Sequence, residues 1–162
     1  MTEVTGYSRA QIAIHWGVVL LLIVSFFSRE GMGEVFRATL QGKEVESAAI
    51  ATLHRIVGIV IFLLALTRIG LRLKHGAPAL PAGGKPLLDL VARITHIGLY
   101  ALILVIPLTG LLTWFGLNRD IGEVHETLFA LLVFFTGLHV VGALYHQFVL
   151  KDGLMERMRR PG

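Results

Sequence analysis

Six of the seven histidines fall within or at the ends of long apolar stretches of the chain. A single histidine in such a stretch is commonly a hydrogen-bonded packing residue. Six of them in four stretches call for another explanation, because a polar ring in lipid is costly and needs a partner. Imidazole nitrogens are ligands for iron, zinc and copper. The six residues are His15, His54, His96, His125, His139 and His146.

The spacing of three histidines places them on one face of a single helix. His139 follows His125 by 14 residues, and His146 follows His139 by seven. In a helix, the interval of 14 residues separates two side chains by about 40° around the axis and about 21 Å along it. The interval of seven residues adds about 20° and about 10 Å. One helix face therefore presents histidines at three depths.

Four hydrophobic stretches can supply the helices that position these side chains, since a membrane-spanning helix needs roughly 20 residues. We predict an all-α, integral membrane four-helix bundle that forms a single domain over residues 1–162. One stretch is interrupted by Arg55, a cation at membrane depth that needs a partner. We expect the first stretch to be a retained helix and not a signal peptide, because no A-x-A cleavage site follows it. The predicted helices cover about residues 8–28, 47–72, 88–116 and 123–150.

Composition and charge agree with a membrane protein. Of the 162 residues 54% are hydrophobic and 16% are charged, whereas soluble domains carry about 25% charged residues. The absence of cysteine excludes disulfides, thiolate metal sites, iron–sulfur clusters and covalent haem attachment. Ten of the fifteen lysines and arginines lie on the side of the two termini, so we predict both termini in the cytoplasm. The net charge of +4 is thus a sign of orientation and not of nucleic-acid binding.

The alternating directions of the helices pair the histidines by depth. His15 lies toward the cytoplasmic side and matches His139, while His54 lies toward the outer side and matches His125. Two opposed ligands at each depth suit bis-histidine haem ligation in a bundle. Zinc or copper, the competing interpretation, needs three or four converging ligands. The zinc motif H-E-x-x-H fails because Phe129 takes the place of its second histidine.

Glycines and arginines near the histidines give further support. Arg9 and Arg55 are candidates to hold haem propionates, although Arg9 can equally be a headgroup anchor. Arg68 and Arg72 are assigned to orientation. Glycine leaves room for a macrocycle, although it also serves ordinary helix packing. The glycines within four residues of a histidine are Gly17, Gly58, Gly98, Gly137 and Gly142.

With these residues in place, the chain resembles the bacterial cytochrome b561 family, which is related to the cytochrome b subunits of hydrogenases and formate dehydrogenases. The resemblance covers nearly the whole chain. It rests on Tyr7-Ser8-Arg9 with Ile14-His15-Trp16, His54, His96 to Tyr100, Pro107 to Gly110, Val124 to Leu128, Gly137-Leu138-His139, His146 and Lys151-Asp152. It implies four helices in the bacterial inner membrane and two non-covalent b haems.

The same resemblance implies the ligand sets and two further roles. His15 and His139 are expected to ligate the cytoplasmic-side haem iron, and His54 and His125 the periplasmic-side haem iron. His96 and His146 match positions outside the ligand set and are candidates to line a quinone site. The alternative for these two is an ordinary buried hydrogen bond.

The resemblance also implies a function. Stand-alone members of the family resemble superoxide:ubiquinone oxidoreductases, so we expect superoxide to be oxidised on the periplasmic side and ubiquinone to be reduced. No side chain is predicted to be catalytic. The alternative is a membrane-anchor subunit that passes electrons between quinone and a periplasmic redox protein, since acids outnumber bases on the outer side. We predict membrane lipid as a further partner and no nucleic acid.

Overall fold

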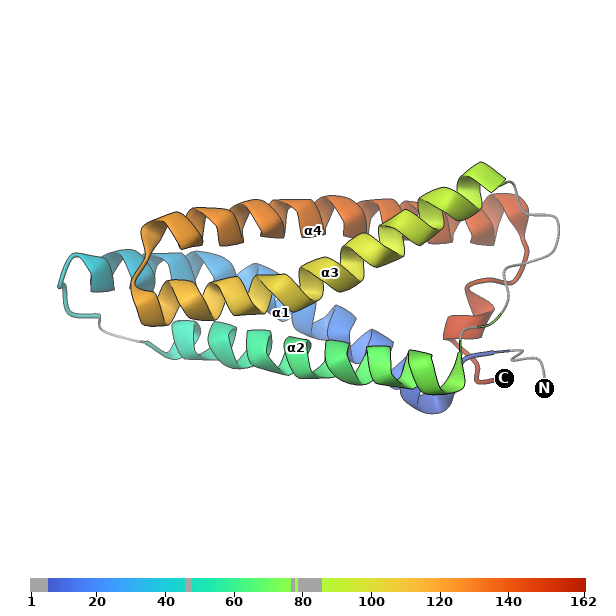
Figure 1. Ribbon diagram of the computed structural model, residues 1–162, viewed down its shortest axis with the longest axis horizontal. Coiled ribbons are helices and arrows are strands. Elements are labelled where there is room, and N and C mark those ends of the chain that lie inside the picture. Colours follow the sequence, from blue (N-terminus) through green and yellow to red (C-terminus); the bar gives the residue numbers. More distant parts are fainter. Residues whose placement is uncertain (1–5, 46–47, 77, 79–85) are drawn as a thin grey trace.

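The computed structural model describes residues 6–45, 48–76, 78 and 86–162, and it places four long helices in this part of the chain (Figure 1). The described residues contain no strand, so the predicted all-α class is confirmed. Residues 77 and 79–85, in the connection between the second and third predicted helices, lie outside the described residues. The helices are α1 (Arg9–Leu40), α2 (Ala49–His75), α3 (Pro86–Gly116) and α4 (Arg119–Tyr145), followed by a π-helix, η1 (His146–Leu150), and a 3₁₀ turn, η2 (Glu156–Met158).

The first helix begins with a capping box. Ser8 Oγ accepts a hydrogen bond from the Gln11 backbone N–H at 3.3 Å, and Gln11 Oε1 accepts one from the Ser8 N–H at 2.9 Å. These two bonds satisfy donors that a helix start leaves free. The Gln11 side chain also donates to the Gly76 carbonyl at 3.3 Å, which ties the start of α1 to the end of α2.

α1 is longer than predicted, because it continues through the expected connection after residue 28 to Leu40. The added segment contains strong helix formers such as glutamate, methionine, arginine and alanine. Gly31 lies there against α2, where a Cβ would meet the Ile50 side chain at 2.9 Å. This close approach lets α1 and α2 stay packed beyond the predicted end of the span.

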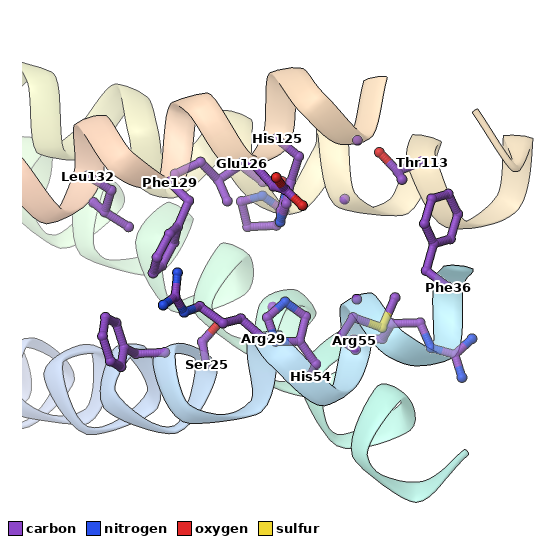
Figure 2. Close-up of a pocket in the computed structure, with 18 of the residues that line it drawn as sticks. Ser25, Arg29, Phe36, His54, Arg55, Thr113, His125, Glu126, Phe129 and Leu132 are labelled. Carbon is purple, nitrogen blue, oxygen red and sulfur yellow. The ribbon is translucent and has the colours of Figure 1, made fainter. Parts of the chain in front are cut away.

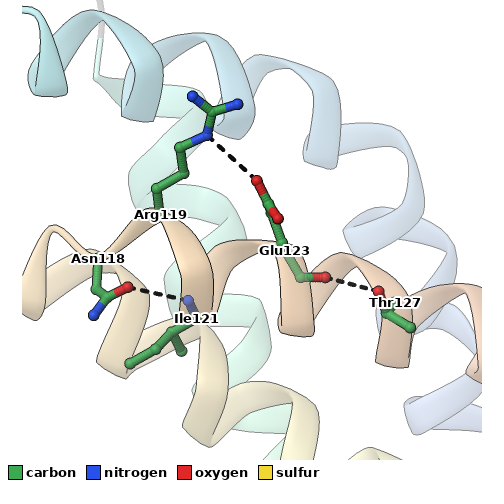
Figure 3. Close-up of polar contacts among 5 residues, drawn as sticks. All are labelled: Asn118, Arg119, Ile121, Glu123 and Thr127. Atoms are coloured by element: carbon green, nitrogen blue, oxygen red, sulfur yellow. Dashed lines mark hydrogen bonds and ion pairs between the residues drawn. The ribbon is translucent and has the colours of Figure 1, made fainter.

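α4 begins at Arg119, a little before the predicted start near residue 123 (Figure 3). Asn118 Oδ1 caps it by accepting from the Ile121 N–H at 3.2 Å. Arg119 Nε lies 3.4 Å from Glu123 Oε1, and the Glu123 carbonyl accepts from Thr127 Oγ1 at 2.9 Å. The turn between α3 and α4 is therefore shorter than the interval 117–122 that the predicted helices leave between them.

The helices pack as two pairs that share a narrow core. α1 packs with α2, α3 packs with α4, and α2 joins the pairs by packing against α3. The core consists of Val57, Ile61, Ala65, Leu102, Ile103, Ile106 and Leu132. Many large apolar side chains face outward instead, as lipid contact allows, and each of the four long helices is long and apolar enough to span a membrane.

Both termini lie at the same end of the bundle (Figure 1), and the Gly162 N–H donates to the Tyr7 carbonyl at 3.4 Å. We call this the terminal end and the opposite one the distal end. Pro107 lies inside α3, which changes direction along its length. A proline inside a helix removes a hydrogen bond of the helix and bends it.

Candidate functional site

A cavity of about 870 Å³ lies among the four helices toward the distal end (Figure 2). Its volume falls in the range of small-molecule and cofactor sites, roughly 300–1,000 Å³. His54 of α2 and His125 of α4 both line it, and Figure 2 shows their rings on opposite walls. We call it the distal cavity.

Hydrogen bonds fix the orientation of His54. Its Nδ1 lies 2.9 Å from Ser28 Oγ, and the Ser28 hydroxyl donates to the Ser25 carbonyl at 3.2 Å. A hydroxyl has one proton to donate. Because that proton goes to Ser25, Ser28 accepts from His54 Nδ1–H. The Nε2 atom of His54 therefore keeps its lone pair, the form in which imidazole ligates a metal.

His125 is held in the same tautomer by α3. Its Nδ1 lies 2.9 Å from the Ile106 carbonyl oxygen, which can only accept, and 3.2 Å from Thr109 Oγ1. Gly110 allows the ring to approach, since a Cβ there would lie 2.9 Å from His125 Cε1. Both histidines of the distal cavity thus carry the hydrogen on Nδ1 and leave Nε2 free to bind iron.

Two arginines of the distal cavity lie over aromatic rings. The Arg55 guanidinium lies 4.3 Å from the ring centroid of Trp114. The Arg29 guanidinium lies 4.8 Å from the centroid of Phe26 and 5.6 Å from that of Phe129. The ring quadrupole stabilises a cation in this position. Both cations line the cavity, but Arg29 lies 3.9 Å from Glu30 and Arg55 donates to the Ala51 carbonyl and Thr52 Oγ1. An anionic group bound in the cavity would share them with these partners.

A second group of side chains joins all four helices nearer the terminal end. The ring centroids of His15 and His139 are 6.2 Å apart, and those of His96 and His139 are 5.0 Å apart. Arg68 Nη1 lies 2.5 Å from His15 Nδ1, and Arg68 Nε donates to the Tyr100 hydroxyl at 3.0 Å. We call His15, Arg68, His96, Tyr100 and His139 the proximal cluster.

The tautomers of the proximal cluster differ from those of the distal cavity. A guanidinium can only donate, so His15 Nδ1 accepts from Arg68 and the ring hydrogen lies on Nε2. His96 Nδ1 donates to the Ala92 carbonyl at 2.6 Å. Ligation of iron by His15 Nε2 therefore requires Arg68 to move away from this ring and the hydrogen to leave Nε2.

Arg68 is a site residue that the sequence pattern does not predict, because its position also suits a role in membrane orientation. In the structure it contacts a predicted iron ligand, whereas Arg9 is the exposed first residue of α1. The spacing could have indicated it, because Arg68 follows His54 by 14 residues, the same interval that separates His125 from His139. Arg68 therefore lies on its helix at a depth that corresponds to that of His139. Within the described residues no carboxylate pairs with Arg68.

The two predicted quinone-site histidines do not lie together. His96 belongs to the proximal cluster, whereas His146 binds Asp152, with Nδ1 2.5 Å from Oδ2. Among the residues that the structure describes, no three His, Asp or Glu side chains converge as a metal-ion site requires.

The glycines near histidines divide into two kinds. Gly98 serves packing, because a Cβ there would lie 3.0 Å from the Phe135 ring. The other four have no atom of another element within 4 Å of an added Cβ. Gly58 is the one of these that lines the distal cavity. The four are Gly17, Gly58, Gly137 and Gly142.

Residues 6–161 match the family model described as prokaryotic cytochrome b561. The chain is 35% identical to "Cytochrome b562" of Cereibacter sphaeroides, over 99% of both chains. It is 31% identical to "Probable superoxide oxidase CybB" of Yersinia pestis, over 94% of both chains. It is 22% identical to "Cytochrome b561 homolog 1" of Escherichia coli, over 94% of this chain and 96% of the relative. Taken with the four membrane-spanning helices, these matches show that the chain belongs to the prokaryotic cytochrome b561 family and is a haem b electron-transfer protein of the bacterial inner membrane.

Proposed function

We propose that the chain holds two b haems, one ligated by His54 and His125 and one by His15 and His139, and that it oxidises superoxide and reduces ubiquinone. The observation that carries the proposal is the presence of two groups of histidines at two levels of one bundle. Bound haem would supply reversible one-electron transfer, and each histidine pair would hold one haem iron.

Support for the distal pair comes from the hydrogen bonds of the two rings. Ser28 and Ile106 hold the Nδ1 atoms of His54 and His125, as outer partners of metal-bound histidines usually do. The cavity between the rings has a volume suited to a cofactor. Arg29 and Arg55 line it and are suited to bind propionate carboxylates.

Support for the proximal pair comes from ring spacing. With metal–nitrogen bonds of about 2.0–2.1 Å, two imidazoles on opposite sides of one metal have centroids about 6 Å apart. His15 and His139 have this spacing at 6.2 Å. His96 is closer to His139, at 5.0 Å, and leaves less room for a metal between the rings. Arg68 is suited to bind a propionate here, whereas the role of Arg9 rests on its sequence position alone.

Superoxide oxidation is proposed for the distal end, which we place in the periplasm because lysine and arginine gather on the side of the termini. The relative from Yersinia pestis is named as a probable superoxide oxidase. Arg29, Arg37 and Arg55 line the distal cavity, together with Glu30, Glu34 and Glu126. Attraction of the anion therefore rests on the local field of the arginines and not on an excess of positive charge.

Ubiquinone reduction is proposed for the terminal end. His96 adjoins the proximal pair, and His146 lies seven residues beyond His139 on the same helix face. Each is a group that can hydrogen-bond a quinone carbonyl or pass it a proton. The anionic lipid of the cytoplasmic leaflet would meet the basic residues of the C-terminal segment, such as Arg159 and Arg160.

A second candidate function is electron transfer between quinone and a periplasmic redox protein. The observation that favours it is the exposure of acidic side chains at the distal end, where Glu30 is 84% and Glu123 67% exposed. Such carboxylates could steer a basic partner to this end.

Rapid mixing of the purified, haem-loaded protein with superoxide distinguishes superoxide oxidation from electron transfer with a redox protein. We expect haem reduction by superoxide, followed by reoxidation when ubiquinone is added. Haem that stays oxidised with superoxide, but is reduced by a co-purifying redox protein, would favour the second function.

A further inference from the structure

The last helix does not end in a regular way. After Tyr145 it widens into η1 (His146–Leu150), and the next residue, Lys151, adopts a left-handed conformation with φ 53°. The Lys151 N–H donates to the His146 carbonyl at 2.8 Å and closes this turn. π-helical turns are rare in proteins, and those that occur are often found at functional sites. A positive φ is unfavourable for a residue with a side chain, such as lysine.

The effect of this turn is to bring Asp152 back onto His146. His146 Nδ1 and Asp152 Oδ2 are 2.5 Å apart, and the second carboxylate oxygen accepts from the Leu154 N–H at 3.1 Å. The two side chains are only 19% and 18% exposed. A carboxylate in this position orients the ring, keeps a hydrogen on Nδ1 and stabilises the imidazolium form.

The charge of Asp152 agrees with this arrangement. Burial acts to raise the pKa of Asp152, but the hydrogen bonds from His146 and from the Leu154 backbone outweigh it and hold the pKa below its ordinary value. Asp152 is therefore the anion of the pair.

We propose that Asp152 is a positioning residue that holds His146 ready to pass protons to quinone. This inference rests on the proposed function, because it assumes that quinone is reduced near His146. In the balanced reaction two superoxide ions each lose one electron and leave as O₂, and ubiquinone gains two electrons and two protons. For each proton, the Nε2–H bond of His146 breaks, its electron pair stays on the nitrogen, and an O–H bond forms on a quinone oxygen. Cytoplasmic water then restores the proton to Nε2.

The C-terminal segment that follows Asp152 is tied to the start of the chain. Trp16 Nε1 of α1 donates to the Met158 carbonyl at 2.9 Å, and Gly162 bonds to Tyr7. Glu156 forms ion pairs with Arg159 and Arg160, at 3.7 and 2.9 Å. Because these contacts also brace the segment, the test must separate positioning of His146 from simple support of the fold.

The test compares three variants of the haem-loaded protein with the wild type in ubiquinone reduction driven by superoxide. Asp152→Asn removes the charge, Asp152→Glu keeps it, and Glu156→Gln is the matched control that alters the same segment without touching His146. We expect Asp152→Asn to lower kcat on the order of 10-fold, a small part of the roughly 10²–10⁴-fold that a positioned proton donor contributes, with little change in KM. Asp152→Glu should recover most of the rate, and Glu156→Gln should behave as wild type. Haem content should be unchanged in all three.

The outcomes separate this inference from the proposed function. A wild-type kcat in Asp152→Asn, together with slow turnover in His146→Ala, would overturn the role of Asp152 and leave the quinone site standing. Wild-type turnover in His146→Ala would overturn the roles of His146 and Asp152 and leave the proposed function standing, whereas a wild-type protein that reduces no ubiquinone would overturn the proposed function itself. Equal slowing in Asp152→Asn and Glu156→Gln, with loss of haem, would show that Asp152 only supports the fold.

Discussion

The distal cavity and the proximal cluster use histidines in opposite hydrogen-bonding states. At the distal end, His54 and His125 donate from Nδ1 to neutral oxygens of Ser28 and Ile106, and their Nε2 atoms are free. At the proximal level, His15 accepts at Nδ1 from the cation Arg68. The distal rings are therefore oriented for iron by neutral groups of the fold. The proximal ring is coupled to a charge that must shift when iron binds.

Removal of the iron ligands is expected to give the largest effect and to separate the two levels. His54→Ala or His125→Ala should lose the distal haem and keep the proximal one, and His15→Ala or His139→Ala should do the reverse. The reason is that alanine has no nitrogen to bind iron, so each variant would leave one haem with a single histidine ligand. Haem content and redox titration of the purified variants measure the outcome.

The exposed His75 at the end of α2 provides the control, since His75→Ala should keep both haems. Equal loss of both haems in every ligand variant of a folded protein would contradict the separation into two sites.

Filling the distal cavity should remove the distal haem without unfolding the protein. Gly58 lines the cavity, and an added Cβ there would meet no atom within 4 Å, so the helices tolerate a larger side chain. We expect Gly58→Leu to fold and to bind only the proximal haem, as haem content will show. Gly70→Leu, at an equally open position that does not line the cavity, should keep both haems. Full haem content in Gly58→Leu would place the haem elsewhere.

Loss of the Ser28 hydroxyl should weaken the distal site alone. Ser28→Ala removes the acceptor for His54 Nδ1, and loss of such a partner typically lowers metal affinity roughly 10- to 100-fold. Haem titration of the apoprotein measures the effect. Thr127→Val, which removes an exposed hydroxyl bonded within α4, is the control and should have wild-type affinity. An unchanged distal affinity in Ser28→Ala would deny the hydroxyl this orienting role.

Neutralising Arg68 should shift the proximal haem only. A nearby cation favours the reduced iron, which carries one positive charge less, so Arg68→Gln should lower the proximal midpoint potential. We expect a shift of tens of millivolts, since roughly 59 mV corresponds to a tenfold change in a one-electron equilibrium. Spectroelectrochemistry resolves the two potentials, and Arg93→Gln, an exposed position on α3, is the control. A shift of the distal potential instead would contradict the proximal placement of Arg68.

The smallest effect is expected outside both sites, in the dependence of stability on pH. Because the folded protein lowers the pKa of Asp152, the charged carboxylate stabilises the fold above its unfolded pKa of about 3.9. That contribution is lost as the pH falls through the lower, folded value. Thermal unfolding of wild type and Asp152→Asn should therefore differ at neutral pH and converge in strong acid. A difference that is the same at every pH would come from packing and not from charge.

The fold could be predicted from the sequence because hydrophobic length and helical spacing are local properties. The lengths of the hydrophobic stretches and the spacing of the histidines predicted four helices, and the structure contains four long helices. The depth of each histidine followed from counting residues along its helix. Contacts between helices are not local, so Arg68 beside His15 and Arg55 over Trp114 were not predicted.

The length of α1 and the contact between Asp152 and His146 could not be predicted from the sequence, because they involve packing and backbone geometry that residue patterns do not specify. The continuation of α1 to Leu40 places Gly31 closely against Ile50, a contact between two helices that no local pattern predicts. The return of Asp152 to His146 depends on a π-helical turn and a left-handed lysine, neither of which has a sequence signature at this site.

The most direct test of the two-site proposal is a pyridine haemochrome assay combined with a redox titration of the purified protein made with ample haem. The proposal predicts two b haems per chain with two separable midpoint potentials, and one haem per chain in His54→Ala and in His139→Ala. A single haem per wild-type chain would contradict the two-site proposal, because only one histidine pair would then bind iron.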